Sequence, residues 1–329
     1  MARYVAITGT GSYLPENILT NLDLEKIVDT NDEWIRQRTG IVERRIADPD
    51  IATSDLCIRA ARKAIKKAEI DPLDIDMIII GTVTPDSFFP STACYVQQAI
   101  GAKNACAFDL SAACAGFVFG LDLADGMIRS GRYQTILVVG GEVFNKIINW
   151  DDRNTCVLFG DAAGAAIVQG TEEATGILAS YIGSDGDYAD ANLLGMPAGG
   201  TRVPASHDSV DQKLHTIRMR GREVFKLGVR IMPEAAQYVL GLAGVTIDEI
   251  TLFIPHQANI RIIEAVGDRL GIAPEKVYIN VDKYGNTSAA TTIVALDEAI
   301  HEERVTSGDL VLLVTFGAGL TWGGTVIKI

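Results

Sequence analysis

The sequence predicts an α/β protein made of two similar halves, each with a mostly parallel sheet and helices packed over it. Strand-like apolar runs alternate with helix-like segments, and the same order of segments recurs after about half the chain. The length of 329 residues suits about two domains, and 48% hydrophobic residues with 32 glycines suit a well-buried α/β fold. We therefore expect two pseudo-repeated βαβαβ halves, residues 1–172 and residues 173–329.

The first part of the repeat is a helix followed by a buried strand. A helix is expected over 57–71 and a strand over 77–82. In the second half a helix over 232–250 leads into a strand over 251–257. Both strands end in polar loops. Since open α/β sheets bind ligands at the carboxyl ends of their strands, these loops are candidate positions for a site.

The second part of the repeat adds another helix and another buried strand. After a strand-like run at 105–108, a helix is expected over 120–131 and a strand over 135–142. The matching elements are a helix over 295–308 and a strand over 310–319. Because lengths and order both agree, a duplication is favoured over the rhythm that βαβ proteins share in general.

Charge and cysteine content exclude several classes of protein. The formal net charge of −13 argues against nucleic-acid binding, since nonspecific affinity for phosphates comes from Lys and Arg. Neither the five cysteines nor the four histidines have ligand spacing, and no complete dinucleotide-binding loop is present. We expect no disulfide, metal or cofactor. Without a signal peptide or spanning segment, we expect a cytoplasmic protein with no membrane partner.

Three residues would converge at strand ends if the halves are duplicated. Cys114 and Asn286 fall at the start of the long helix of their halves, and His256 follows the strand over 251–257. A helix N-terminus favours a thiolate, and the small neighbours of Cys114 leave room for a carbonyl group. The sequence therefore predicts a cysteine nucleophile with a histidine and an asparagine beside it.

Each of these residues also has a structural interpretation. Taken singly, His256 is more typical of a core or loop histidine, and Asn286 of a turn or helix cap. Only their joint placement favours a site. The remaining cysteines are interpreted as buried structural residues: Cys57, Cys94, Cys106 and Cys156.

The residue types favour a reaction that places negative charge on oxygen. Histidine and asparagine side chains offer N–H donors for a thioester carbonyl whose oxygen becomes negative, as in decarboxylation of a malonyl thioester. Backbone N–H groups of the loop over 316–320 could hold a second oxyanion beside Cys114. The glycines of that loop equally suit a simple turn.

Motifs along nearly the whole chain resemble those of the thiolase-fold condensing enzymes, most closely the β-ketoacyl-acyl-carrier-protein synthase III family. They include "DLSAACAGF", "FGDAAGAA", "PHQANIRII", "YGNTSAAT" and "FGAGLTWGG". The resemblance implies a thiolase-like fold with αβαβα layers and a catalytic triad of Cys114, His256 and Asn286. Cys114 would take an acyl group from acyl-CoA, and His256 with Asn286 would hold the enolate formed when malonyl carrier protein loses CO2. The backbone N–H groups of Cys114 and Gly319 would form the oxyanion hole.

The resemblance also assigns contacts to substrate and partner subunit. Residues matching Trp34, Arg38 and Arg153 bind the adenine and phosphates of CoA in the family, and the residue matching Asn259 lines the pantetheine tunnel. The residue matching Phe89 reaches the partner's tunnel in a homodimer. Acyl-CoA is thus implied as a substrate, with no further cofactor. Phe89 and Phe144 near the tunnel end favour a short primer such as acetyl-CoA.

A basic cluster stands out in this acidic chain. Over residues 217–230 the single acid Glu223 accompanies five cations: Arg218, Arg220, Arg222, Lys226 and Arg230. Local clustering of this kind would steer an acidic carrier protein to the enzyme, and the cluster matches the docking region of the family. The helix after Arg261 carries acids where relatives often have a lysine pair. We therefore expect docking chiefly at Arg222 and Lys226, with Arg261 nearby.

Other reactions compete with this interpretation. Cysteine, histidine and asparagine occur in the same order in papain-like hydrolases, with His256 at 142 residues after Cys114, but the other hydrolase motifs are missing. Hydroxymethylglutaryl-CoA synthases are not excluded by spacing. We expect an acyltransferase that condenses a short acyl-CoA with malonyl carrier protein to initiate type II fatty acid synthesis. A polyketide-type or secondary-metabolite ketosynthase is the alternative.

Overall fold

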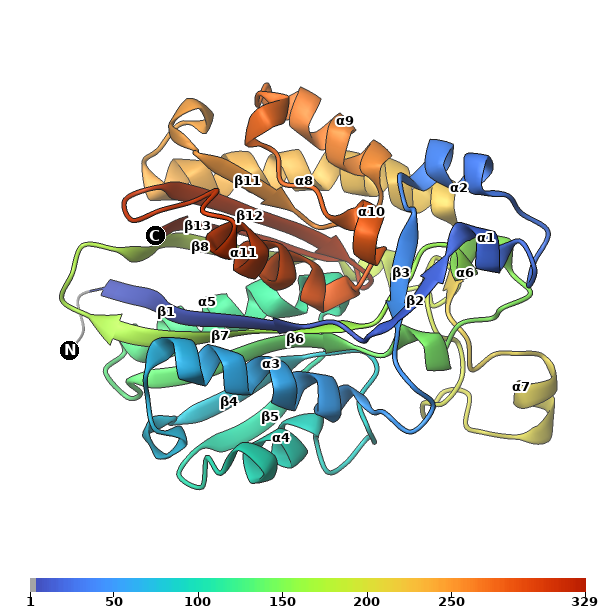
Figure 1. Ribbon diagram of the computed structural model, residues 1–329, viewed down its shortest axis with the longest axis horizontal. Coiled ribbons are helices and arrows are strands. Elements are labelled where there is room, and N and C mark those ends of the chain that lie inside the picture. The colour runs from blue at the N-terminus through green and yellow to red at the C-terminus, as the bar shows by residue number, and fades with distance from the viewer. Residues whose placement is uncertain (1–3) are drawn as a thin grey trace.

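Two large sheets run through the molecule (Figure 1). The computed structural model describes residues 4–329, so the first three residues of the expected half 1–172 lie outside the described part. The first sheet has the strand order β1 (Tyr4–Tyr13), β7 (Ala162–Thr171), β6 (Thr135–Glu142), β4 (Met77–Gly81) and β5 (Cys106–Leu110). The second has the order β11 (Leu252–Pro255), β12 (Leu310–Gly317), β13 (Thr321–Lys328) and β8 (Gly176–Ser184). Two short antiparallel pairs join β2 (Asn17–Thr20) to β3 (Glu43–Ile46) and β9 (Leu194–Gly195) to β10 (Arg218–Met219).

The two sheets repeat one pattern of strand pairing. β4 is parallel to β5 and β6, whereas β7 is antiparallel to both β6 and β1. In the second sheet β11 is parallel to β12, and β13 is antiparallel to both β12 and β8. A single parallel bridge from Phe253 to Val277 occupies the position that corresponds to β5. The predicted pair of βαβαβ halves is therefore confirmed, and their boundary between 172 and 173, in the β7–β8 connection, stays a prediction.

Helices and sheets form the expected αβαβα layers (Figure 1). The outer face of the first sheet is covered by α3 (Thr53–Ala68) and α4 (Thr92–Ile100), and that of the second by α8 (Gly221–Ala243) and α9 (Ile260–Leu270). Between the sheets lie α5 (Gly116–Arg129) and α11 (Thr291–His301). The shorter helices are α1 (Asn21–Leu24), α2 (Asp32–Thr39), α6 (Arg153–Cys156), α7 (His207–Asp211) and α10 (Val281–Tyr284). None of the helices in the described residues is both long and apolar enough to cross a bilayer.

Two helices differ clearly from their predicted bounds, since the helix expected over 295–308 ends at His301 and α8 differs at both ends. The expected helix over 232–250 begins earlier, since α8 starts at Gly221 and continues through Pro233. Proline lacks the N–H that would bond to the carbonyl four residues back, which is that of Val229. Arg269 of α9 donates to this carbonyl at 2.8 Å. A side chain of the neighbouring helix thus satisfies the group that proline leaves open, and the helix is not interrupted.

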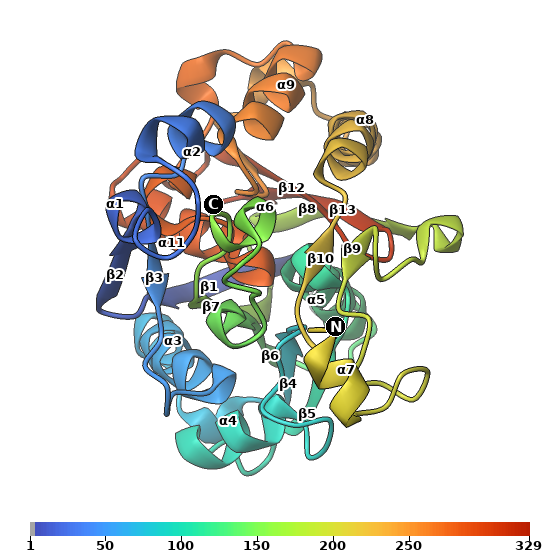
Figure 2. The same ribbon diagram turned by 90° about the vertical axis from the view of Figure 1, so that its right-hand side faces the viewer.

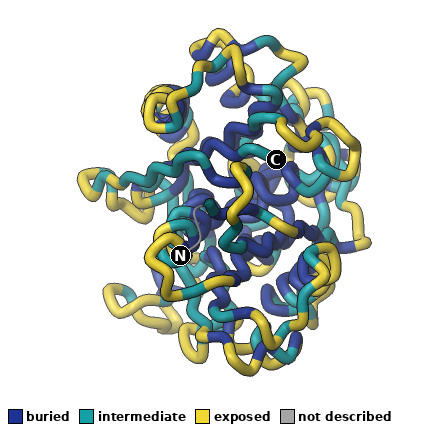
Figure 3. Tube along the Cα trace, turned by 90° about the vertical axis from the view of Figure 1, so that its left-hand side faces the viewer, coloured by how far each residue is buried: buried dark blue, intermediate teal, exposed yellow. Residues whose placement is uncertain are grey.

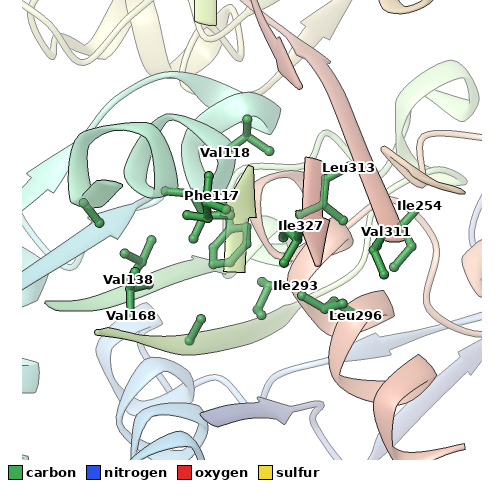
Figure 4. Packing of buried hydrophobic residues seen from close by; sticks show 14 of the residues in the cluster. Phe117, Val118, Val138, Val168, Ile254, Ile293, Leu296, Val311, Leu313 and Ile327 are labelled. Atoms are coloured by element: carbon green, nitrogen blue, oxygen red, sulfur yellow. The ribbon is translucent and has the colours of Figure 1, made fainter. Parts of the chain in front are cut away.

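The two halves share a core between the sheets. Phe117 of α5 and Ile293 of α11 pack among side chains from both sheets, including Val138 of β6 and Leu313 of β12 (Figure 4). Seen from the end that holds both termini, buried segments fill the centre and exposed loops lie at the periphery (Figure 3). Each sheet needs the other to bury its inner face, so we expect the halves to unfold together.

Replacing Phe117 by Ala should remove a fully buried ring from this shared core. We expect the free energy of unfolding to fall by about 3–5 kcal/mol, from lost burial and the cavity left behind. Urea unfolding followed by circular dichroism measures the change, and Leu22→Ala at an exposed position should shift it by less than about 0.5 kcal/mol. Two separate transitions in the parent, one for each half, would contradict a shared core.

Candidate active site

A cavity of about 760 Å³ opens where strands of both sheets end. Cys114, His256 and Asn286 all line it, together with residues of α2, α8 and α9. Figure 2 looks onto this end of the molecule, where α2, α6, α8 and α9 gather. The structure thus brings the three residues singled out from the sequence into one site.

Cys114 lies in a short 3-10 turn, Ala113–Ala115, that connects β5 to α5. Ala113 has a left-handed φ of 47°, which turns the chain sharply after the strand. Gly317 at the end of β12 packs against the turn, and a Cβ added there would lie 2.7 Å from the backbone nitrogen of Cys114. Only glycine allows the second sheet to approach Cys114 this closely.

The thiol of Cys114 does not have the low pKa expected at a helix start. Burial raises its pKa to about 12, the nearby Ser288 hydroxyl lowers it, and the carboxyl of Glu142 raises it further. Desolvation is the largest effect because the side chain is 8% exposed and charge is costly there. The free site therefore holds a protonated thiol at neutral pH, and ionisation of this thiol requires a group that accepts its proton.

His256 follows β11 directly and is 3% exposed. Its backbone N–H donates to the carbonyl of Val314 in β12 at 2.8 Å, which fixes the backbone. Its ring Nδ1 lies 2.8 Å from Thr291 Oγ1 at the start of α11. Burial lowers the pKa of the imidazole to about 3, so the ring is neutral at neutral pH. Nε2 is left as the ring nitrogen available to a ligand.

Thr291 controls which nitrogen of His256 carries the proton. Its single hydroxyl proton has two acceptors in reach, the carbonyl of Ser288 at 2.9 Å and Nδ1 of the ring. When the hydroxyl donates to Nδ1, the neutral ring carries its proton on Nε2 and can donate into the cavity. When it donates to Ser288, Nδ1 carries the proton and Nε2 becomes an acceptor.

Asn286 is held by backbone bonds on both sides. Its backbone N–H donates to the carbonyl of Leu158 at 2.8 Å, and its backbone carbonyl accepts from the N–H of Gly160 at 3.1 Å. Its side-chain Oδ1 accepts from the N–H of Ser288 at 2.8 Å. This bond leaves the Nδ2 group of the amide as a donor for a ligand in the cavity.

Two polar residues beside the triad were missed by sequence reasoning. Ser288 lines the cavity with a fully buried hydroxyl, and Glu142 is buried at the last position of β6. The available signals were a polar residue inside the small-residue motif "GNTSAAT" and a glutamate ending the apolar run "TILVVGGE". Neither signal indicates by itself which side chains these residues meet.

The residues expected to bind CoA lie near the mouth of the cavity. Trp34, Arg38 and Asn259 line it, and the guanidinium of Arg38 lies 4.6 Å from the centre of the Trp34 ring. Arg153 does not line the cavity, but its guanidinium lies over the Trp34 ring, 5.1 Å from the ring centre. Arg153 is also held by Asp29, through a 3.0 Å bond to its carbonyl and a 3.7 Å ion pair.

The cations expected to dock the carrier protein lie at the same opening. Arg222, Lys226 and Arg261 are exposed and line the cavity, and within the described residues none of them has an acidic partner. Arg220 is different, because it forms ion pairs with Asp190 and Glu223. The local charge at the cavity mouth is therefore positive in a chain of net charge −13.

Some expected residues lie outside the cavity. Phe89 is 86% exposed and does not line it, whereas Phe144 does, stacked on Phe159 with ring centres 4.7 Å apart. Phe316 and Ala318 of the 316–320 loop join Cys114 in the lining, whereas Gly319 does not.

The burial expected for all the structural cysteines is wrong in two cases. Cys94 and Cys106 are exposed, because they lie on the outer helix α4 and at the start of the edge strand β5; Cys57 and Cys156 are buried. Within residues 4–329, no group of three or more His, Cys, Asp or Glu side chains is arranged to hold a metal ion.

Comparison with known proteins identifies relatives that cover the whole chain. The family model "3-Oxoacyl-[acyl-carrier-protein (ACP)] synthase III" matches residues 108–186, which include Cys114, and its C-terminal counterpart matches residues 240–329, which include His256 and Asn286. A beta-ketoacyl-[acyl-carrier-protein] synthase III of Caldanaerobacter subterraneus subsp. tengcongensis is 58% identical over 98% of this chain and 97% of its own length.

Solved structures show the same similarity. The 3-oxoacyl-[acyl-carrier-protein] synthase III of Aquifex aeolicus has a TM-score of 0.91 at 48% identity, covering 99% of this chain and 100% of its own. The priming beta-ketosynthase from the R1128 polyketide biosynthetic pathway also has a TM-score of 0.91, at 35% identity, covering 100% of this chain and 97% of its own.

The neutral, buried state of His256 predicts a specific loss of stability in acid. The ring has a pKa near 6.5 in the unfolded chain and about 3 in the folded protein. Between these values the unfolded chain binds a proton that the folded protein does not, so stability falls as the pH drops below about 6.5. From this group alone we expect a loss of about 2 kcal/mol on going from pH 7 to pH 4.5.

Urea unfolding of the parent and of His256→Gln at pH 7 and pH 4.5 measures this loss of stability. The difference in the free energy of unfolding between the two pH values should be smaller in His256→Gln than in the parent. His301 is exposed, so His301→Gln should behave like the parent. Equal pH dependence in the parent and His256→Gln would show that the imidazole is not held neutral by burial.

Proposed function

The chain belongs to the 3-oxoacyl-[acyl-carrier-protein] synthase III family, and from that premise we propose that Cys114, His256 and Asn286 divide the family's reaction between them. It is a condensing acyltransferase of fatty acid biosynthesis, also called β-ketoacyl-acyl-carrier-protein synthase III. The observation that carries the proposed roles is the single cavity lined by all three side chains.

In the first half-reaction Cys114 takes the acyl group from acyl-CoA. Its sulfur attacks the thioester carbonyl, and the oxygen that becomes negative is held by backbone N–H groups of Cys114 and Gly319. The close packing of Gly317 on the nitrogen of Cys114 brings the 316–320 loop to the place where such donors are needed. Ala318 lines the cavity from the same loop. The products are an acyl-cysteine and free CoA.

In the second half-reaction a malonyl thioester loses CO2 and attacks the acyl-cysteine. The enolate oxygen is held by Nε2 of His256 and Nδ2 of Asn286, the two side-chain nitrogens that the protein leaves free. Thr291 supports this step by donating to Nδ1, which keeps the proton on Nε2. Two uncharged donors in a buried site stabilise a forming enolate more than they stabilise the neutral thioester.

Acyl-CoA enters from the side of α2 in this proposal. The Trp34 ring stacks on the adenine while Arg38 and Arg153 meet phosphates, an arrangement suited to arginine and tryptophan. Asn259 contacts the pantetheine chain along the cavity wall. Phe144 closes the acyl end and restricts the primer to a short chain such as acetyl-CoA. No cofactor takes part.

The malonyl group arrives on acyl carrier protein, which docks at Arg222, Lys226 and Arg261. These cations are exposed at the mouth of the cavity that the carrier's prosthetic arm must enter. Attraction between a local positive patch and an acidic partner raises the rate of encounter in an enzyme that is acidic as a whole.

We propose further that the enzyme is a cytoplasmic homodimer. The strand β5 is at the edge of the first sheet, and Phe88 and Phe89 in the loop before α4 are 76% and 86% exposed. An open strand edge and exposed large rings in one region suit pairing with a second subunit. Phe89 would then reach the acyl end of the partner's cavity.

A polyketide-type ketosynthase is not favoured. The identity to the R1128 priming ketosynthase is 35%, against 48% and 58% for the fatty acid synthesis relatives from Aquifex and Caldanaerobacter.

Intact-protein mass spectrometry tests the division of labour between the triad residues. Incubation with acetyl-CoA should add one acetyl group to the parent and none to Cys114→Ala. His256→Ala and Asn286→Ala should acylate within about tenfold of the parent but lose on the order of 10²-fold in discharge by malonyl carrier protein, since they lack an enolate donor. Equal loss of acylation in all three variants would contradict the proposed roles, and discharge by water alone would indicate a hydrolase.

Charge reversal at the cavity mouth tests the docking site. Lys226→Glu should raise the KM for malonyl carrier protein about tenfold, through lost attraction and new repulsion, and leave the KM for acyl-CoA within twofold. Lys67→Glu on the exposed side of α3 makes the same change in net charge away from the cavity and serves as the control. Similar effects of both variants would mean that only net charge matters.

A further inference from the structure

The protonated thiol of Cys114 needs a proton acceptor, and the triad offers a poor one. Burial raises the pKa of the thiol to about 12 and lowers the pKa of His256 to about 3. An imidazole that holds protons so weakly is an unfavourable base for a thiol. Another group facing the same site would therefore have to take the proton.

The hydroxyl of Ser288 is a polar group beside Cys114 that the proposed mechanism does not use. It lines the cavity with Cys114, is buried, and has no hydrogen-bond partner within residues 4–329. It nevertheless lies close enough to the Cys114 thiol and to the Glu142 carboxyl to lower the pKa of both. Ser288 has a left-handed φ of 50°, a conformation that costs a serine free energy and is typical of functional sites.

The turn that carries Ser288 is packed directly on the end of β6. A Cβ added at Gly140 would lie 2.3 Å from the carbonyl oxygen of Ala289, so the strand touches the backbone of the Ser288–Ala290 turn. Glu142 is two residues further along this strand. This packing, rather than any neighbouring loop, brings the carboxyl of Glu142 to the Ser288 hydroxyl.

The surroundings of Glu142 suit a carboxylate that accepts a proton from one side. Its Oε2 accepts from Thr82 Oγ1, Thr84 Oγ1 and the backbone N–H groups of Val83 and Thr84, at 2.7–3.1 Å. Among the described residues, its Oε1 accepts only from the backbone N–H of Val83, at 3.2 Å, and shares this donor with Oε2. Oε1 therefore has capacity for one more donor. Its charge raises the pKa of two thiols, those of Cys114 and Cys57, and it forms no ion pair within the described residues.

We propose that Ser288 and Glu142 form a proton relay that removes the proton of Cys114 when the acyl group is transferred. As the sulfur attacks the thioester, its S–H bond breaks and the proton moves to Ser288 Oγ, while the Ser288 proton moves to Glu142. The bond from the acyl carbon to the CoA sulfur then breaks, and the departing thiolate takes the proton back from Glu142 through Ser288. The inference rests on the proposed role of Cys114 as nucleophile.

Charge balance supports this route over transfer to His256. The pKa of Glu142 is raised to about 7 by burial, so the carboxylate is present at neutral pH and is a stronger base than the imidazole. Ionised Glu142 raises the pKa of Cys114; once protonated, it no longer opposes the thiolate. One negative charge moves from oxygen to sulfur, and no new charge pair is created in the buried site.

The test compares Ser288→Ala and Glu142→Gln with the parent. Ser288→Ala keeps the backbone groups that bind Asn286 and Thr291 and removes only the hydroxyl. Two rates are measured between pH 6 and pH 9: single-turnover acetylation of Cys114 by acetyl-CoA, and alkylation of Cys114 by iodoacetamide, both followed by intact mass. Thr292→Val is the matched control, because the buried hydroxyl of Thr292 also has no partner among residues 4–329 but does not line the cavity.

Both relay variants should acetylate on the order of 10²-fold more slowly than the parent at pH 7.5, and both should lose the rise in alkylation rate around pH 7 that Glu142 produces. Thr292→Val should match the parent in both rates. Should Glu142→Gln fail to fold, Ser288→Ala carries the test alone.

Two results would overturn the relay. If Glu142 acted only as a nearby charge, Glu142→Gln would lower the pKa of the thiol and alkylate faster than the parent. The relay predicts the opposite change in the alkylation rate. An unchanged alkylation profile in Ser288→Ala would exclude the hydroxyl. Because alkylation does not involve acyl-CoA, a parent that shows the pH rise but is never acetylated would overturn the proposed function and leave the relay supported.

Discussion

The placement of two helices between two sheets is the constraint on which the site depends. Because α5 and α11 are covered on both sides, their first turns are forced to meet where the strands of both sheets end. Both turns contain a left-handed residue, Ala113 at φ 47° and Ser288 at φ 50°, each of which costs on the order of 1–3 kcal/mol. The shared core holds these strained turns in place. Cys114 and Ser288, which are 288 − 114 = 174 residues apart in the chain, thereby come to line one cavity.

Burial gives this site its electrostatic character. Desolvation raises the pKa of Cys114 and Glu142 and lowers the pKa of His256, so uncharged forms are favoured at all three positions. In such surroundings an oriented N–H group interacts strongly with a forming oxyanion, and no cation is required. The same burial means that the thiol cannot ionise unaided. In the proposed mechanism, acyl transfer and enolate formation therefore place different demands on one pocket, and separate groups meet them.

Charge is concentrated instead at the opening. Arg38, Arg222, Lys226 and Arg261 line the mouth, while the inner wall is formed by aromatic and aliphatic side chains such as Phe144 and Phe159. Anionic groups of CoA and an acidic carrier protein would meet these cations before the thioester reaches Cys114. The position of the charges thus separates recognition of the carrier from the chemistry of the acyl group.

The sequence by itself determined the architecture, because strand and helix signals are local, and it singled out the three central residues only through their joint placement in the repeat. Buried apolar runs mark strands directly, as in β6, whose observed bounds Thr135–Glu142 are those predicted, and Cys114, His256 and Asn286 stand out after strand ends. Only the tertiary structure decided the start of α8, where Arg269 compensates for Pro233, and the exposure of Cys94 and Cys106. It alone decided the high pKa of Cys114 and the contacts of Glu142, Ser288 and Thr291. Desolvation and contacts between distant segments arise from packing, which no local pattern of residues encodes.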